Sequence, residues 1–267
     1  MQARIVLIGC LALVAAILAT APAAAQSRAF PGSDVFTMHL PSGWVRIPDE
    51  VLEEFSARAR QASPSLPEHV YACGFQGQAG PPWALPPFVL VQVANTGRIS
   101  EAALLDPRRA DAALDKAAAA ARNRLKDLVS DVDLSGSSYE PEGHILWKTG
   151  VVEGTEGRGG KLLVGVRLTQ VGMISIICFA REKDFDAYRP TFERIVRDVE
   201  LDDRLVYKPR LIDAHPWLAY IGWGEPWGYA MASMAIALVS GISAAILARR
   251  KKAAAKGDSL RSAGGPS

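Results

Sequence analysis

Two long uncharged stretches stand near the ends of the chain, and the segments between them alternate hydrophobic and polar residues with the periods of helices and strands. The C-terminal stretch covers the twenty-two residues 227–248 and is followed at once by four basic residues, 249–252. At about 1.5 Å per residue a helix of that length spans about 33 Å, close to the thickness of a bilayer core. This pattern predicts one C-terminal transmembrane helix over residues 227–248.

The N-terminal stretch has the layout of a secretory signal peptide. Arg4 precedes an apolar run over residues 5–21, and small residues at 23–25 offer a cleavage site before Gln26. We therefore predict a signal peptide over residues 1–25. Two alternatives stay open at this point: lipidation of Cys10 within a short lipobox, and an uncleaved anchor that would give the chain two membrane crossings.

The charges divide the chain into an acidic and a basic part. Residues 26–226 hold 23 Lys plus Arg against 27 Asp plus Glu, whereas residues 227–267 hold 6 against 1. Basic residues are retained on the cytoplasmic side of membranes. The charges therefore predict a single-pass protein of the bacterial inner membrane with a periplasmic, extracytoplasmic domain and a basic, disordered cytoplasmic tail over residues 249–267. The basic cluster fits anionic lipid headgroups, and nucleic acid is not an expected partner.

Aromatic residues gather in the linker over residues 205–226 and at the start of the transmembrane segment. They are Trp217, Tyr220, Trp223, Trp227 and Tyr229. Such side chains favour the headgroup layer of a bilayer, which predicts an outer interface segment. Packing of the same side chains beneath the extracytoplasmic domain is the alternative.

Small residues recur every four positions within the transmembrane segment. They are Ser233, Ala237, Gly241 and Ala245. Residues at this spacing form one stripe along a helix, and in lipid such stripes allow close helix packing. The stripe predicts a homodimer formed through the transmembrane helix, and chance spacing in an alanine-rich segment is the alternative.

Residues 26–204 show the periods of a single α+β domain. Strand patterns cover residues 36–40, 70–75, 88–94, 146–153, 162–170 and 173–180. Helical patterns cover residues 48–62, 108–128 and 185–199, and we expect Pro190 in the first turn of the last helix because a proline there loses no hydrogen bond. This order predicts an antiparallel β-sheet flanked by helices, an α/β/α sandwich.

Two groups of residues also resemble a known superfamily. The early group is Leu40-Pro41-Ser42-Gly43-Trp44, and the late group is Phe179-Ala180-Arg181-Glu182, Asp184-Phe185, Tyr188, Pro190, Phe192 and Ile195. Together they resemble the PsbP/DcrB-like α/β/α sandwich superfamily. The resemblance implies a small extracytoplasmic or membrane-associated binding or assembly factor, and it transfers no active-site residue.

The residues that carry chemistry form no recognisable motif. The four histidines stand far apart in the sequence, and the serines around Gly136 are typical of a turn and not of a nucleophile elbow. The segment 154–161 departs from the spacing of a P-loop, and we expect it to be the tip of a hairpin. We therefore predict no catalytic, cofactor or metal site. The expected function is a membrane-tethered, non-catalytic module that binds an unidentified envelope protein. The alternative is an envelope enzyme with a site assembled from scattered residues, with Trp44, Trp83 and the loop 77–87 as cleft walls.

The predicted domain contains two cysteines, Cys73 and Cys178. Both fall in predicted strands of an exported domain, where oxidation is permitted. A disulfide between them and two buried free thiols are both open at this point.

Overall fold

The computed structural model describes residues 27–62, 70–99, 101, 129–134, 136–154 and 159–210. The predicted signal peptide, the helix predicted over residues 108–128, the predicted transmembrane helix over 227–248 and the tail lie outside these residues, as do Ser233, Ala237, Gly241 and Ala245. Among the described residues, no helix is long and apolar enough to cross a membrane.

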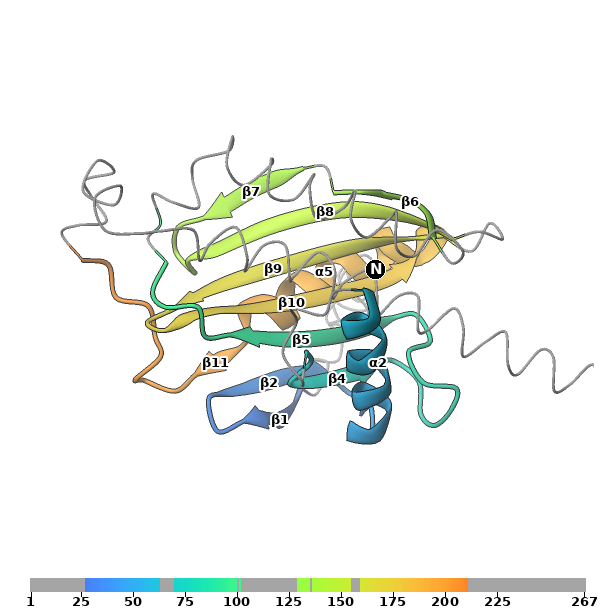
Figure 1. Ribbon diagram of the computed structural model, residues 1–267, viewed down its shortest axis with the longest axis horizontal. Helices are drawn as coiled ribbons and strands as arrows, with labels where there is room; N and C mark the ends of the chain where they lie inside the picture. The colour runs from blue at the N-terminus through green and yellow to red at the C-terminus, as the bar shows by residue number, and fades with distance from the viewer. Residues whose placement is uncertain are drawn as a thin grey trace, which may run out of the picture.

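An eight-stranded antiparallel sheet forms the centre of the domain (Figure 1). From one edge its strands are β3 (Val45–Arg46), β4 (Cys73–Gln76), β5 (Phe88–Ala94), β10 (Gly172–Arg181), β9 (Gly160–Thr169) and β8 (Ile145–Gly154). At the other edge, β6 (Val129–Asp133) and β7 (Ser137–Glu140) both pair with β8. The central strand β10 is buried on both faces along all but its last residue, which explains its nearly unbroken apolar sequence.

A second antiparallel sheet of three strands contains β1 (Ser27–Ser33), β2 (Phe36–Pro41) and β11 (Glu200–Leu201). The sequence pattern predicts β2 but not that it belongs to a separate sheet. Alternate residues of β2 are buried, so that Phe36, Met38 and Leu40 enter the core while Thr37 and His39 are partly exposed. This alternation is typical of a sheet with one face packed and one face toward water.

The two described helices, α2 (Asp49–Ala62) and α5 (Glu182–Arg197), contact opposite faces of the large sheet. Leu52 of α2 packs over Gly74, and Val196 of α5 packs over Gly165. The strand registers align Gly165 with Cys73 across the sheet, so these two residues face the same side. Gly74 follows Cys73 in the same strand and therefore faces the opposite side. Figure 1 shows α2 in front of the sheet and α5 behind it. The α+β class and the antiparallel sheet predicted from the sequence are confirmed.

Helix α5 begins earlier than predicted, and the expectation for Pro190 is wrong. The helix starts at Glu182, and Pro190 lies inside it rather than in its first turn. Pro190 is exposed, whereas Phe185, Phe192, Ile195 and Val196 are buried on the opposite side of the helix. Burial of this apolar face holds both halves of the helix on the sheet despite the hydrogen bond that a proline removes.

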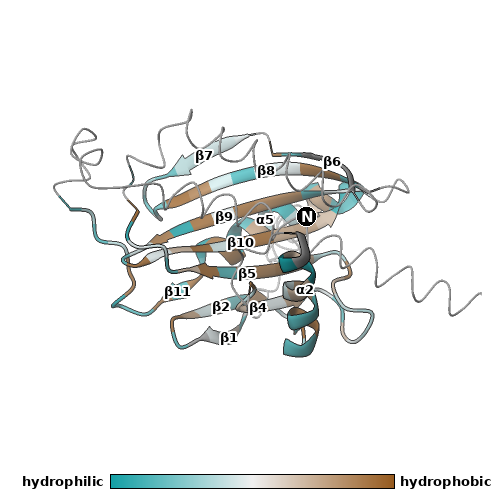
Figure 2. Cartoon of the chain, viewed as in Figure 1, coloured by the Kyte–Doolittle hydropathy of each residue, from teal (hydrophilic) through white to brown (hydrophobic). Residues whose placement is uncertain are grey.

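The main hydrophobic core lies between α5, the small sheet and the α5-facing side of the large sheet. Phe192 is fully buried and touches Trp44, Phe185 and Tyr188 through ring contacts. Figure 2 shows the hydrophobic colour concentrated on β5, β9 and β10, in the middle of the sheet. The strand β7 lies at the edge of the sheet beyond this core, and the space between it and α5 is the groove described below.

Candidate functional site

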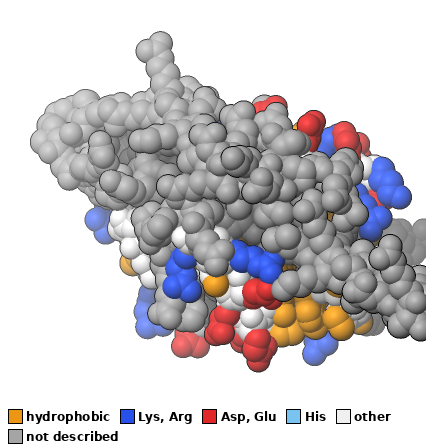
Figure 3. Space-filling view, turned by 45° about the vertical axis from the view of Figure 1, so that its right-hand side comes forward, with side chains coloured by type: hydrophobic (Ala, Val, Ile, Leu, Met, Phe, Trp, Pro, Cys, Tyr) orange, Lys and Arg blue, Asp and Glu red, His pale blue; other side chains and the backbone are white. Residues whose placement is uncertain are grey.

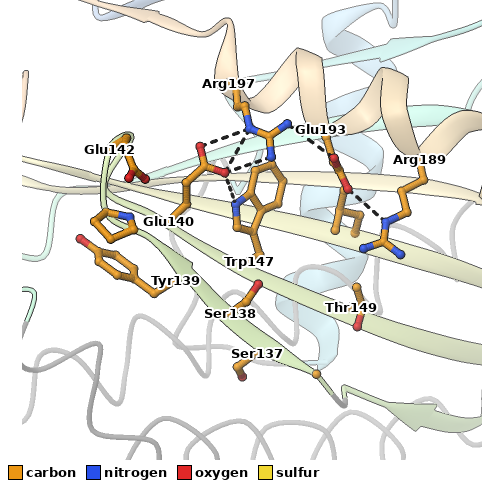
Figure 4. A pocket seen from close by; sticks show the side chains of 13 residues that line it. Ser137, Ser138, Tyr139, Glu140, Glu142, Trp147, Thr149, Arg189, Glu193 and Arg197 are labelled. Atoms are coloured by element: carbon orange, nitrogen blue, oxygen red, sulfur yellow. Dashed lines mark hydrogen bonds and ion pairs between the residues drawn. The ribbon is translucent and has the colours of Figure 1, made fainter.

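A groove of about 610 Å³ separates helix α5 from the strand β7 at the edge of the large sheet (Figure 4). Its helical wall consists of Arg189, Glu193 and Arg197, and its floor includes Trp147, Thr149 and Leu163. The opposite wall is formed by consecutive residues from 136 to 142, which include all of β7. The groove is therefore elongated, with a helix on one side and an edge strand on the other.

The helical wall follows from a spacing of four residues. Arg189, Glu193 and Arg197 recur every four positions and so form one stripe along α5. Arg189 Nε donates to Glu193 Oε1 at 3.0 Å, and Arg197 Nη1 donates to Glu193 Oε2 at 3.5 Å. Glu193 thus bridges the two arginines and fixes their spacing along the wall.

Glu140 connects the two walls of the groove. Arg197 Nη2 donates to Glu140 Oε2 at 3.0 Å and Arg197 Nε donates to the same carboxylate at 3.1 Å, while Trp147 Nε1 donates to it at 3.1 Å. The hydrogen bonds from Arg197 lower the pKa of Glu140 below its ordinary value, and the hydrogen bond from Trp147 adds to this effect. Partial burial acts in the opposite direction. Arg197 also lies over the Trp147 ring, 5.2 Å from its centroid. The carboxylate is therefore ionised at neutral pH and fixed in place.

Arg167 supports this arrangement from the strand β9. Its Nη1 donates to the backbone carbonyl oxygens of Val199 and Arg197, the latter at 3.4 Å. Carbonyl groups at the end of a helix have no partner within the helix, so a cation there satisfies them and complements the helix dipole. Burial lowers the pKa of Arg167, and the charge of nearby Glu140 opposes that effect. The C-terminal end of α5 is thus held against the sheet beside the groove.

A second polar cluster lies near the turn between β7 and β8. His144 pairs with Glu101, its Nδ1 is 3.3 Å from the Tyr139 hydroxyl, and its ring centroid is 5.0 Å from that of Tyr207. Burial, and then the hydrogen bond with Glu101, raise the pKa of Tyr139 well above its ordinary range. Arg98 lies over the Tyr207 ring and donates to the Lys208 carbonyl oxygen at 2.9 Å. This cluster ties the last described residues of the domain to the sheet.

The two cysteines of the domain are free thiols. Cys73 of β4 pairs with Val91 of β5, and Cys178 of β10 pairs with Val89 on the other side of β5, so their alpha carbons are two strand spacings and two residues apart, or about 12 Å. A disulfide needs alpha carbons within about 7 Å of each other. Burial raises the pKa of Cys73 to about 12 and that of Cys178 higher still, so both thiols are protonated at neutral pH. Of the two alternatives from the sequence, the structure has the buried thiols.

Trp44, one of the cleft walls suggested for the enzyme alternative, lies in the hydrophobic core. Trp44 is 7% exposed and packs edge-on against Phe192, with ring centroids 6.4 Å apart, so it belongs to the core. The loop that carries Trp83 is held from within, because Gln76 Nε2 donates to the carbonyl oxygens of Gln78 and Gly80. Within the described ranges, no three His, Cys, Asp or Glu side chains are grouped as metal ligands would be. The expectation of Trp44 as a cleft wall is therefore wrong.

Sequence reasoning missed the residues of the groove. In the sequence, Glu140 and Glu142 look like ordinary surface charges on either side of Pro141. The two strands that flank the glycine-rich segment 154–161 pair with each other, as the predicted hairpin requires. One signal was available, namely the repeat of charged residues at 189, 193 and 197. That repeat marks a polar stripe on the helix, but it does not reveal that a sheet edge lies opposite.

The fold and the groove define a class of protein: an α+β domain with a large antiparallel sheet, two described helices on opposite faces and a surface groove at one sheet edge. No family model matches the chain, and no curated protein matches it. Among solved structures, the chain is similar to cyanobacterial PsbP (CyanoP) from Synechocystis sp. PCC 6803, with 12% sequence identity and a TM-score of 0.44. The match covers 68% of this chain and 96% of that one. This resemblance is at the level of the fold, as the sequence predicts, and it identifies no functional residue.

Proposed function

We propose that the protein is a single-pass envelope protein of the bacterial inner membrane, whose extracytoplasmic domain binds a partner protein through the groove between α5 and β7. The membrane part of this proposal rests on the sequence alone, on the apolar segments near both ends and on the acidic and basic halves of the chain. The binding part rests on the geometry of the described domain.

The groove supports binding because its walls are fixed before any partner arrives. Charge-assisted hydrogen bonds link Arg189, Glu193, Arg197 and Glu140 into one network. The bonds between Arg197 and Glu140 join residues that are 57 positions apart in the sequence. Preorganised side chains lose little freedom on association, so more of the contact energy appears as affinity. Figure 3 shows Lys and Arg side chains beside Asp and Glu on the described part of one face of the molecule.

A photoreactive side chain placed in the groove tests the binding proposal. We would replace Ser138, which is exposed on the groove wall, with a photoreactive residue in the full-length chain and irradiate living cells. The matched control is the same replacement at Glu53, which is exposed on α2. We expect a discrete protein adduct from position 138 and none from position 53. Equal adducts from both positions, or none from position 138, would contradict the proposal.

Reporter fusions test the membrane topology separately. A reporter that is active only in the cytoplasm should work when fused after Ser267 and fail when fused after Pro209. Neutral replacements at residues 249–252 should weaken the preference for this orientation. An active fusion after Pro209 would place the domain in the cytoplasm and refute the extracytoplasmic assignment.

A further inference from the structure

We infer that the partner protein contributes an extended strand, which pairs antiparallel with the outer edge of β7 beside the groove and carries a basic side chain about four residues before an acidic one, both directed toward the groove. This inference rests on the proposed function, because it names the kind of segment that the same groove binds. Its observations are an unpaired strand edge, the length of the helical wall and opposite charges at the two ends of the groove.

Among the described residues, the outer edge of β7 has no partner strand. β7 pairs with β8 on one side, and no other described strand pairs with it. Ser137 and Ser138 are exposed. An edge strand presents unpaired backbone N–H and C=O groups, and an extended peptide that adds to it gains main-chain hydrogen bonds while its alternate side chains enter neighbouring pockets.

The length of the helical wall gives the approximate spacing of the partner's side chains, because Glu142 lies in the turn just beyond Glu140, the residue that Arg197 contacts. Arg189 and Arg197 are separated by eight helical residues, which corresponds to about 12 Å along α5. An extended chain rises about 3.3 Å per residue and therefore crosses this distance in about four residues. An even spacing places both side chains on the same face of the partner strand, toward the groove.

The charges left available at the two ends have opposite signs. Arg197 and Glu140 are paired with each other. Arg189 keeps 53% of its side chain exposed, and among the described residues its only polar contact is with Glu193, through Nε. Figure 4 shows its guanidinium on the side of the groove where Thr149 lies. At the other end Glu142 is exposed. An acidic side chain fits beside Arg189, and a basic one fits beside Glu142.

The direction of the partner strand follows from these positions. β7 runs from Ser137, on the Thr149 side of the groove, toward Glu142. Antiparallel pairing is the slightly more stable arrangement, and it makes the partner run the other way. The partner therefore reaches Glu142 first with its basic residue and Arg189 afterwards with its acidic one.

Two labelled peptides of identical composition test the inference. We would measure the fluorescence anisotropy of Lys-Val-Thr-Val-Asp and of Asp-Val-Thr-Val-Lys, both with blocked ends, against the full-length protein. We expect the first peptide to bind about threefold more tightly or better, which is the scale of one exposed ion pair. Its binding should also slow hydrogen exchange of the backbone amides of residues 137–140.

Charge reversal provides a further control, because misfolding of a variant cannot increase its affinity for a peptide of opposite charge. Arg189→Glu should weaken the binding of the Lys-first peptide and strengthen the binding of a variant peptide that has Lys at both ends. Arg194 is an exposed neighbour on α5 that does not line the groove, so Arg194→Glu should change neither affinity. Equal affinity of the two peptide orders, or exchange protection outside residues 137–142, would overturn the inference. Adducts from position 138 together with equal affinities of the two peptides would support the proposed function. They would refute only the inference that the partner segment is an extended strand with this order of charges.

Discussion

Replacing Glu140 with glutamine removes the charge that joins β7 to helix α5. The side chain is 25% exposed, and it accepts two hydrogen bonds near 3.0 Å from Arg197 and one from Trp147. Charge-assisted hydrogen bonds are worth about 1.5–3 kcal/mol when buried, and exposed pairs are worth less than about 1 kcal/mol. For this partly exposed group we expect Glu140→Gln to lower the free energy of unfolding by about 1–2 kcal/mol at neutral pH.

The pH dependence separates the charge from the shape of the side chain. Because the folded state holds the pKa of Glu140 below the ordinary value of 4.5, its contribution is present above that value and is lost as the pH falls through the lowered pKa of the folded state. The difference between the wild type and Glu140→Gln should therefore be constant near neutral pH and shrink in acid. Below the folded pKa, both side chains are neutral and the two proteins should approach equal stability.

Urea denaturation of the full-length protein, followed by tryptophan fluorescence, measures both effects. Glu142→Gln is the matched control, because Glu142 lies two residues away, in the turn that follows β7, and is exposed, so its replacement should not measurably change stability. Equal stability of Glu140→Gln and the wild type at neutral pH would show that solvent screening cancels the contacts. A difference that persists unchanged in acid would show that the lost energy is packing rather than charge.

Three further predictions address the core and the membrane segment. Cys73 and Cys178 should resist thiol reagents in the folded protein and react only after unfolding, with a melting temperature unaffected by reductant, since burial raises both pKa values; rapid labelling of the native protein would contradict this. Gly165→Ala should cost about 1–3 kcal/mol, because the added carbon would overlap Val196, and Val196→Ala should relieve much of that cost in the double variant. Gly241→Leu, outside the described residues, should reduce helix association in a membrane two-hybrid assay, and unchanged association would make the stripe a feature of composition.

The elements that depend on local pattern were predictable. The strand over 88–94 and the helix over 48–62 have the expected type and nearly the expected bounds, because their apolar residues repeat with the period of one element and stand between clear turn residues. Sequence reasoning missed β1, β3, β6, β7 and β11, and two of these strands, β3 and β11, have only two residues each. Two residues are too few to show an alternating pattern, so the existence of such a strand is decided by the neighbour with which it pairs.

The groove was not predictable for a different reason. Its central contact joins Glu140 and Arg197, which are 57 residues apart in sequence, and each residue alone resembles an ordinary surface charge. Only the packing of α5 over β9, with Val196 resting on Gly165, brings the polar stripe of the helix opposite the sheet edge. The core therefore determines where the site lies, although no core residue chemically marks it.

The same ion pairs account for both the stability and the proposed binding of the groove. Arg167 holds the end of α5 to β9, and Arg197 with Glu140 holds the next part of the helix to β7. Arg189, farther toward the N-terminus of α5, makes no such contact across the groove among the described residues and keeps more than half of its side chain exposed. The wall is thus rigid at one end and open to a new charged partner at the other. A partner that bound chiefly at the closed end would have to break contacts that stabilise the domain, whereas one that binds Arg189 gains an ion pair without that cost.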